Sequence, residues 1–361
     1  MHPAASGGKV AREHPGLDCM NRSVKTELPQ DSSPVLAEVV RGGMVESRHH
    51  ASVAVVDAHG GIVHAWGDID LPIYGRSAIK PLLAIPLVES GAADRFKLSV
   101  AEIALATASH NSEPRHVETV TAWLERIGLG IEDLECGAHY PAHEPTMQAM
   151  LRAQQEPNRA HNNCSGKHAG FLATAIHLGE PTKGYIQYEH PVQRRLLGLL
   201  EQMSALELGE APRGIDGCGI PVIAIPIANT ALAMARMADP HHLPDERAAA
   251  CRRILAAMMA DPFMVAGTDR FCTKLMSAVP GKAAIKVGAE GVYCGALPEL
   301  GLGICLKVTD GASRACEVVM GQVLRHLGVI DEAMAEELGK TLTPEIKNWA
   351  GTPTGLVRPA F

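Results

Sequence analysis

The sequence predicts an α+β (mixed α/β) protein in which segments from both ends of the chain form one antiparallel sheet. Strand-like segments come first, a long helical block follows, and strand-like segments return before the last helices. No internal repeat and no regular alternation of strands and helices is present, which disfavours a doubly wound parallel sheet. We therefore expect a sheet with covering helices and an inserted helical region.

The first strands are expected at residues 36–43, 48–57 and 62–67, where β-branched residues are frequent. The sequence His59-Gly60-Gly61 between the last two is typical of a hairpin turn. A helix is then predicted over residues 77–90, because its apolar side chains recur at helical spacing and Gly91 follows as a stop signal.

The middle of the chain, about residues 98–265, is expected to form helices joined by turns. Ser99 and Glu102 form a capping box at the start of one of them. The other helices are predicted at about residues 114–128, 144–155, 166–178, 191–205, 220–237 and 246–260. Strands return in the segments AAIKVG, VYCGAL and LGICLKVTD, before helices at about residues 312–327 and 330–338.

These elements predict a single catalytic unit over residues 35–361. Its sheet part spans residues 35–75 and 281–361, and its mainly helical part spans residues 76–280. The preceding residues, 1–34, are polar and carry no apolar run, so we expect a disordered N-terminal extension without a signal peptide.

The composition excludes several classes of partner. The net charge is −7, no run of Lys or Arg is present, and aromatic residues make up only 4%, so nucleic acid is not an expected partner. No stretch of 18 apolar residues exists, so no membrane span is expected. We therefore expect a cytoplasmic protein whose nine cysteines are mostly thiols.

Ser77 and Lys80 form an S-x-x-K pattern at the start of a predicted helix. Residues three apart lie on the same side of a helix, so the lysine could serve as the base that activates the serine. A capping serine beside a solvated lysine would give the same spacing. Two further segments favour the catalytic interpretation: the polar cluster that begins at Ser109, and Lys286 on a C-terminal strand. The same order of motifs occurs in the serine β-lactamase and penicillin-binding fold.

The segment HNNCSGKHAG, residues 161–170, combines a thiol, an amine and an imidazole. Cys164, Lys167 and His168 would share one helix face, and the loop GIDGCGIP adds Asp216 and Cys218. This set could hold a zinc ion. A redox pair of Cys164 and Cys218, or structural thiols beside a polar site, would also explain these residues.

The motifs HNNCSGKH, GRSAIK, ASHN and IDGCGIP together resemble the Rhizobium-type (class 3) L-asparaginase family, also named the asparaginase II family. The resemblance covers the chain from about Val40 onward. It implies a fold similar to that of serine β-lactamases and class A glutaminases, and a homodimer. It also implies two Ser-Lys tandems, Ser77 with Lys80 and Ser109 with Lys286.

The resemblance further implies zinc binding by Cys164, Lys167 and Cys218, with Asp216 beside the metal. The expected reaction is hydrolysis of L-asparagine to L-aspartate and ammonia through an acyl-enzyme, with Ser77 as the nucleophile or, alternatively, Ser109. We expect Arg76, Asp216 and His168 to contact the substrate, since the guanidinium of Arg76 suits a carboxylate. The alternative functions are a catalytically silent binding protein and a penicillin-recognising serine hydrolase.

Overall fold

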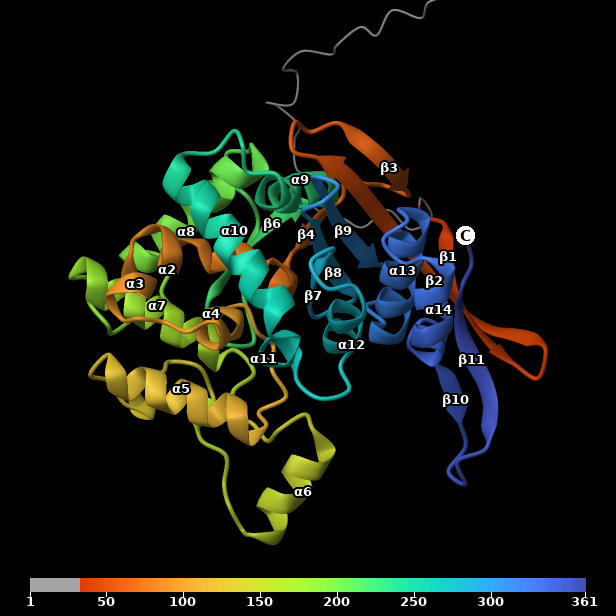
Figure 1. The fold of residues 1–361 in the computed structure, drawn as a ribbon, viewed down its shortest axis with the longest axis horizontal. Coiled ribbons are helices and arrows are strands. Elements are labelled where there is room, and N and C mark those ends of the chain that lie inside the picture. The colour runs from red at the N-terminus through yellow and green to blue at the C-terminus, as the bar shows by residue number, and fades with distance from the viewer. Residues whose placement is uncertain (1–32) are drawn as a thin grey trace, which may run out of the picture.

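The computed structural model describes residues 33–361 (Figure 1). The predicted disordered extension lies outside the described residues except for its last two. Within the described part, the main sheet has the strand order β10-β11-β1-β2-β9-β8-β7, and β3 pairs with β2. The neighbouring strands pair antiparallel. The predicted α+β fold class, with a sheet built from both ends of the chain, is therefore confirmed.

The strands of the main sheet are β1 (Val35–Arg41), β2 (Met44–Asp57), β3 (Ile62–Trp66), β7 (Ala284–Val287), β8 (Val292–Leu297), β9 (Leu302–Val308), β10 (Glu345–Lys347) and β11 (Pro353–Pro359). A second, smaller sheet has the order β4-β6-β5, with bounds Pro72–Tyr74, Pro221–Pro226 and Arg213–Ile215. Predicted strands at both ends of the chain therefore meet in one sheet, and the small sheet joins it to the helical part.

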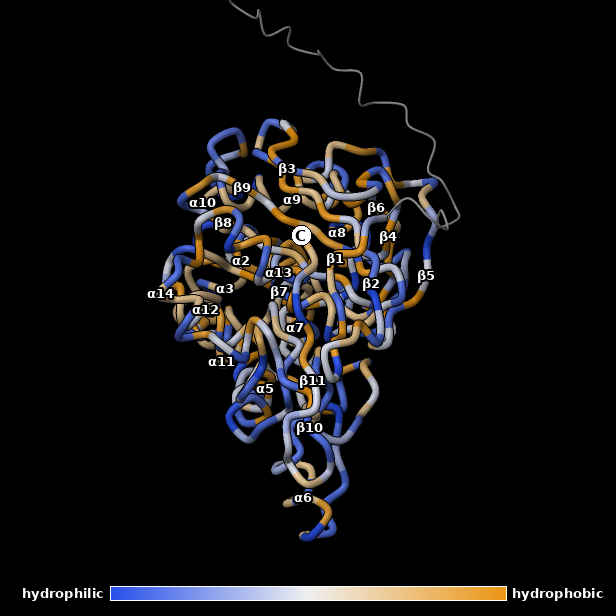
Figure 2. Tube along the Cα trace, turned by 90° about the vertical axis from the view of Figure 1, so that its right-hand side faces the viewer, coloured by the Kyte–Doolittle hydropathy of each residue, from blue (hydrophilic) through white to orange (hydrophobic). Residues whose placement is uncertain are grey.

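The helices of the inserted region are α1 (Lys80–Leu83), α2 (Ile85–Glu89), α3 (Ala92–Arg95), α4 (Val100–Ala106), α5 (Pro114–Arg126), α6 (Glu144–Arg152), α7 (Ser165–Leu178), α8 (Pro191–Ser204), α9 (Ile227–Ala238), α10 (Asp245–Ala260), α11 (Pro262–Ala266) and α12 (Phe271–Ala278). The C-terminal helices are α13 (Ser313–His326) and α14 (Glu332–Leu338). Short 3-10 helices occur as η1 (Arg76–Ile79), η2 (Ile131–Asp133), η3 (Arg159–His161) and η4 (Gly339–Thr341). Figure 2 shows α6 at the end of the molecule, beyond α5 and β10.

The packing of α9 against the sheet depends on a glycine in β9. A Cβ atom at Gly303 would overlap the backbone of α9 at Ala231 and Ala235, so only glycine permits this approach. Side chains alternate along a strand, so Cys305 lies on the same face as Gly303. The cross-strand register then runs from Cys305 through Cys294 to Lys286. Lys286 thus lies on the sheet face that α9 covers.

Two predicted helices are interrupted, and prolines are the reason in both cases. The segment predicted as one helix over residues 77–90 consists of η1, α1 and α2, because Pro81 and Pro86 cannot donate backbone hydrogen bonds inside a helix. The helix predicted over residues 220–237 begins only at Ile227. Pro221 and Pro226 bound a strand, β6, which pairs on both sides in the small sheet.

Strand β11 has no counterpart among the predicted elements. It contains two prolines and one glycine, which lower the strand signal of the sequence. The strand forms because it pairs with β1 along its length and with β10 on its other side. Tertiary pairing therefore determines this element, and β-propensity does not.

Replacement of Gly303 by alanine should destabilise the protein by about 1–3 kcal/mol, because the new Cβ would force β9 and α9 apart. Thermal unfolding would measure the effect. Gly198→Ala is the matched control, since nothing lies within 4 Å of a Cβ there and the residue lies inside α8. That variant should gain about 1 kcal/mol from helix propensity. Equal unfolding temperatures for the two variants would contradict the predicted close packing.

Candidate active site

The turn that carries Ser77 follows directly from β4. Arg76 adopts a left-handed backbone conformation, with φ of +47°, which is unusual for a residue other than glycine and costs conformational energy. The end of β7 lies against this turn, where a Cβ at Gly288 would come within 3.0 Å of the Ala78 backbone nitrogen. The sheet therefore holds Ser77 in place. Among the described residues, no hydrogen bond of the Ser77 hydroxyl is found.

The segment after α4 holds Ser109 between two other parts of the chain. The Ser109 backbone N–H donates to Val265 O at 3.0 Å, and the His110 N–H donates to Asn163 O at 3.2 Å. The side chain of His110 adds a further link. Its Nδ1 accepts from the Ser112 N–H at 3.1 Å, so its Nε2 carries the proton and donates to Ser165 Oγ at 2.9 Å.

Two buried lysine side chains meet at the hydroxyl of Ser109. Lys80 Nζ lies 3.0 Å and Lys286 Nζ lies 2.9 Å from Ser109 Oγ. Lys80 also donates to Ala108 O and lies 3.1 Å from Cys164 Sγ, while Lys286 donates to Val287 O at 2.7 Å. The structure therefore brings Ser109 and both predicted lysines together. It places Lys80 in contact with Ser109 and not with the nearby Ser77.

Burial is the main influence on the protonation of both amines. It lowers the pKa of Lys80, and the negative charge of Cys164 partly opposes this effect. It lowers the pKa of Lys286 far below its usual range, and the charge of Lys80 lowers it further. Of the two amines, Lys286 therefore loses its proton more readily, as a general base requires.

The start of α7 approaches the end of α4 very closely. A Cβ at Gly166 would overlap the carbonyl oxygen of Leu105, so a glycine is required between the two helices. This approach brings Cys164 to Lys80. In the same region, Lys167 Nζ lies 2.9 Å from Cys218 Sγ. The predicted thiols and amines of HNNCSGKHAG and IDGCGIP thus converge beside Ser109.

The charges in this thiol and amine cluster stabilise one another. A hydrogen bond from Cys218, assisted by the cations Lys80 and Lys167, holds the pKa of Cys164 well below its usual range. The same hydrogen bond and burial raise the pKa of Cys218. Burial opposes the charge on Lys167, but the two sulfur atoms outweigh it and raise the pKa of this lysine. The Cys164 sulfur therefore lies buried near the cations Lys80 and Lys167, an environment that favours its thiolate form.

Arg76 and Asp216 form an ion pair beside this cluster. Arg76 Nε donates to Asp216 Oδ1 at 2.8 Å, and Asp216 Oδ2 lies 4.0 Å from Cys218 Sγ. His168 is placed differently. It has no exposed surface, its Nδ1 lies 2.8 Å from the Tyr185 hydroxyl, and its Nε2 has no partner within the described residues.

The cluster provides a donor set that suits zinc. Two sulfur atoms and an amine from α7 and the loop before β6 lie within hydrogen-bond reach of one another, and thiolates are preferred zinc ligands. Lys167 must lose its proton before it can bind a metal. In the part of the chain that the structure describes, no group of three or more His, Cys, Asp and Glu residues is arranged to hold a metal ion.

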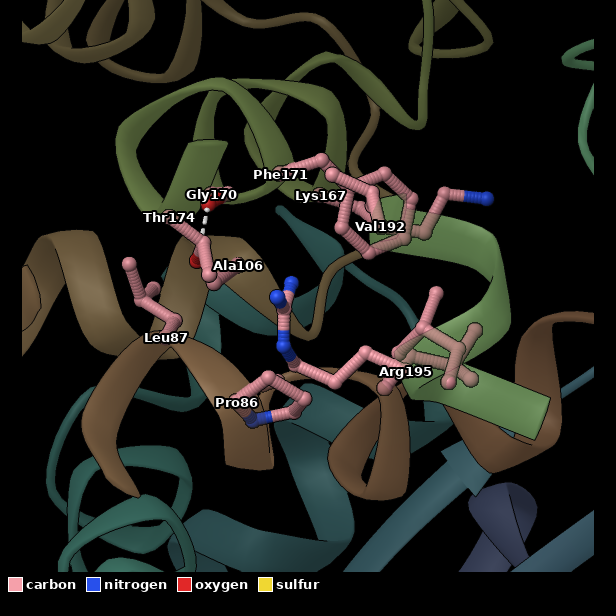
Figure 3. Close-up of a pocket in the computed structure, with 12 residues that line it drawn as sticks. Pro86, Leu87, Ala106, Lys167, Gly170, Phe171, Thr174, Val192 and Arg195 are labelled. Atoms are coloured by element: carbon pink, nitrogen blue, oxygen red, sulfur yellow. Dashed lines mark hydrogen bonds between the residues drawn. The ribbon is translucent and has the colours of Figure 1, made fainter. Parts of the chain in front are cut away.

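Two cavities adjoin the cluster, and both are largely apolar. The first, of about 310 Å³, lies behind Lys167, and Figure 3 shows the Arg195 guanidinium pointing into the space beside Pro86 and Ala106. The second, of about 530 Å³, has the ion pair of Arg76 and Asp216 in its lining. Both volumes include open solvent. Neither cavity is lined by Ser109, so the polar centre of the site is separate from both.

The model of the L-asparaginase II family matches residues 37–359. The chain belongs to the L-asparaginase II family. The resemblance found in the sequence is thereby confirmed, and as a family member the protein is a hydrolase that acts on amides. A search of curated protein sequences found no match to this chain. Within residues 33–361, no helix is both long enough and apolar enough to cross a membrane.

Solved structures with a similar chain course include Mglu and a β-lactamase. One structure of Mglu is 13% identical, with 77% of this chain and 67% of that chain covered and a TM-score of 0.43. Mglu in its native form is 14% identical, with 83% and 69% covered and a TM-score of 0.44. A β-lactamase from Mycobacterium bovis is 14% identical, with 76% and 94% covered and a TM-score of 0.37.

The sequence predicts that the run Gly267-Thr268-Asp269-Arg270 is a loop near the site and that Lys274 could contact the substrate, but it does not single out Arg270. The structure places Arg270 against Asn111, two residues after Ser109, with 2.9 Å between Arg270 Nη1 and Asn111 Oδ1. The run Gly267-Thr268-Asp269-Arg270 is polar and rich in turn-forming residues, which was the available signal. It does not indicate that the side chain of Arg270 contacts Asn111.

Lys286→Met should raise the unfolding temperature at pH 7 by about 2–4 °C, because methionine keeps much of the volume and removes a buried amine. The wild type should also become more stable as the pH rises towards 10.5, the ordinary pKa of lysine. In that range the unfolded chain binds more protons than the folded protein does. Between pH 6 and 10, the unfolding temperature of Lys286→Met should therefore rise less with pH than that of the wild type. The difference in slope should correspond to about one proton taken up on unfolding.

The exposed Lys347 offers a matched control for this experiment. Lys347→Met should leave the pH profile of the unfolding temperature unchanged. A Lys286→Met variant whose profile keeps the slope of the wild type would show that Lys286 is protonated at neutral pH.

Proposed function

We propose that the protein hydrolyses the side-chain amide of L-asparagine to L-aspartate and ammonia through an acyl-enzyme. The observation that carries this proposal is the convergence of two buried lysine amines on the hydroxyl of Ser109. A serine hydroxyl becomes a nucleophile when a neighbouring base removes its proton, and a lysine of lowered pKa is such a base. Membership of the L-asparaginase II family supports the choice of an amide substrate.

The contacts of the two lysines support different roles for them. Lys80 has three acceptors, Ala108 O, Ser109 Oγ and the Cys164 sulfur, which equals the number of protons on an ammonium group. The Ser109 hydroxyl proton then needs another acceptor, and the only other amine in contact with it among the described residues is that of Lys286. Neutral Lys286 can accept this proton while it donates to Val287 O.

In this mechanism Ser109 Oγ attacks the amide carbon as Lys286 takes the proton. Lys286 then returns the proton to the departing ammonia, and a water molecule hydrolyses the ester with the same lysine as base. The positive charge of Lys80 stabilises the oxyanion that forms beside Ser109. Ser77, on the turn that the end of β7 supports, would face the same centre as a proton relay. This assignment favours the alternative nucleophile over Ser77.

We also propose that Cys164, Lys167 and Cys218 hold a zinc ion, with Asp216 beside it. When bound, zinc would supply a positive charge that orders the cluster and orients the polar end of the substrate. The charge of Lys167 and the hydrogen bond from Arg76 would keep Asp216 ionised beside the cluster. We also propose that His168, whose ring lies against Tyr185, contacts the substrate. The homodimer and the cytoplasmic location stay predictions.

Ser109→Ala should lower kcat for L-asparagine by about 10⁴-fold or more, since it removes the nucleophile. Ser77→Ala should lower kcat by about 10²-fold, as expected for the loss of a proton relay. Ammonia release would measure both, and mass spectrometry of quenched turnover should find the aspartyl ester on Ser109. An ester on Ser77 would reverse the two roles. The absence of ammonia release from wild type with zinc supplied would favour a silent binding protein, and turnover of a chromogenic cephalosporin would favour a penicillin-recognising hydrolase.

Protein purified without chelator should contain about one equivalent of zinc, since two thiols and an amine complete three of four tetrahedral positions. Elemental analysis would measure it. Replacing both Cys164 and Cys218 by serine should reduce the zinc content below about a tenth of an equivalent. The matched control replaces Cys251 and Cys316, which are buried outside the cluster, and should keep the metal. Equal zinc contents in the two double variants would reject this site.

A further inference from the structure

Arg270 is held at the edge of the site by a short polar loop. Its Nη1 donates to Asn111 Oδ1 at 2.9 Å, and Asn111 Nδ2 donates to Thr268 O at 3.0 Å. Glu113 fixes the same loop, because its carboxylate accepts from the Thr268 N–H and hydroxyl, each at 2.7 Å. The guanidinium is therefore tied to the segment that carries Ser109.

The charge of Arg270 has no ion-pair partner within 4.0 Å among residues 33–361. Its hydrogen bond to Asn111 is made to a neutral amide, so most of the guanidinium donors remain available. Burial raises the pKa of the Glu317 carboxyl, and the positive charge of Arg270 opposes this effect. Arg270 is also partly exposed, so a ligand can reach it.

Arg76 differs from Arg270 in each of these respects. Its charge is already matched by Asp216, and both residues line the apolar cavity of about 530 Å³. That cavity contains leucine and isoleucine side chains, which suit a carboxylate poorly. Arg270 instead lies close enough to Lys286 for its positive charge to lower the pKa of that amine further. An anionic group of a substrate would be stabilised there.

We propose that Arg270, positioned by Asn111, binds the α-carboxylate of the amino-acid substrate while Ser109 attacks its side-chain amide. This inference rests on the proposed function and specifies the substrate class as amides that carry a free α-carboxylate. The planar guanidinium suits a carboxylate in a two-point contact. The residue acts in recognition and takes no part in proton transfer.

The test compares L-asparagine with 3-aminopropanamide, which is the same molecule without the α-carboxylate. Arg270→Gln should lower kcat/KM for L-asparagine by about 100-fold, mainly through KM, because it removes a charged contact to the substrate. The same variant should change kcat/KM for 3-aminopropanamide by less than about 3-fold, since that substrate has no group for Arg270. Arg270→Lys should recover part of the loss on L-asparagine. Arg253→Gln, at an arginine paired with Asp94 on the surface, should affect neither substrate.

Two outcomes would overturn the inference. An equal loss on both substrates would mean that Arg270 only supports the loop. A loss confined to L-asparagine in Arg76→Gln, with Arg270→Gln active, would assign the carboxylate to Arg76. If the wild type hydrolyses neither amide, the proposed function is wrong. Calorimetry with L-aspartate would then still test whether Arg270 binds an α-carboxylate. Binding by wild type and not by Arg270→Gln would support it, and equal binding would reject it.

Discussion

The contact of two buried amines with one serine hydroxyl is the constraint on which the rest of the site depends. Two ammonium groups could not occupy this dry space together, because each would lose its hydration and repel the other. The fold reduces this conflict by placing a sulfur atom beside one of the two amines. Cys164 lies beside Lys80, where its ionised form would offset the charge of that amine, while Lys286 contacts one backbone carbonyl, Val287 O, and the Ser109 hydroxyl. The thiol cluster and the serine site are therefore one electrostatic unit.

Close backbone packing holds the residues of the serine site and the thiol cluster in position. Gly303 lets α9 lie directly on β9, and Gly288 lets the end of β7 reach the Ser77 turn. Gly166 brings α7 to α4, so that residues far apart in the chain meet at hydrogen-bond distance. Each contact involves backbone atoms on at least one side, which relax less readily than side chains do. The precise distances around Ser109 follow from these three approaches.

The sequence predicted the general architecture because hydrophobic periodicity and turn residues report local structure directly. Short motifs led to the prediction that Ser77, Lys80, Ser109, Lys286 and the thiol cluster form the site, and the structure brings Ser109, both lysines and Cys164 into contact. It could not predict β11, whose pairing with β1 joins residues at opposite ends of the chain. For the same reason it paired Lys80 with Ser77, its neighbour in the chain, whereas the fold directs the amine to Ser109. The spacing of residues in the sequence indicates which side chains are neighbours within one helical turn. It does not indicate which distant segments meet in the fold.

The two sides of the site differ in how freely their residues can change over evolutionary time. At Gly166 a single added carbon would push α7 away from the serine segment, so selection leaves this position almost no alternatives. The cavity beside Arg76 is lined mainly by aliphatic side chains, and such side chains exchange for one another at little cost when the volume is kept. Amino-acid substitutions should therefore accumulate among the residues that line this cavity. Related enzymes would come to differ in the shape of the cavity while keeping the same chemistry.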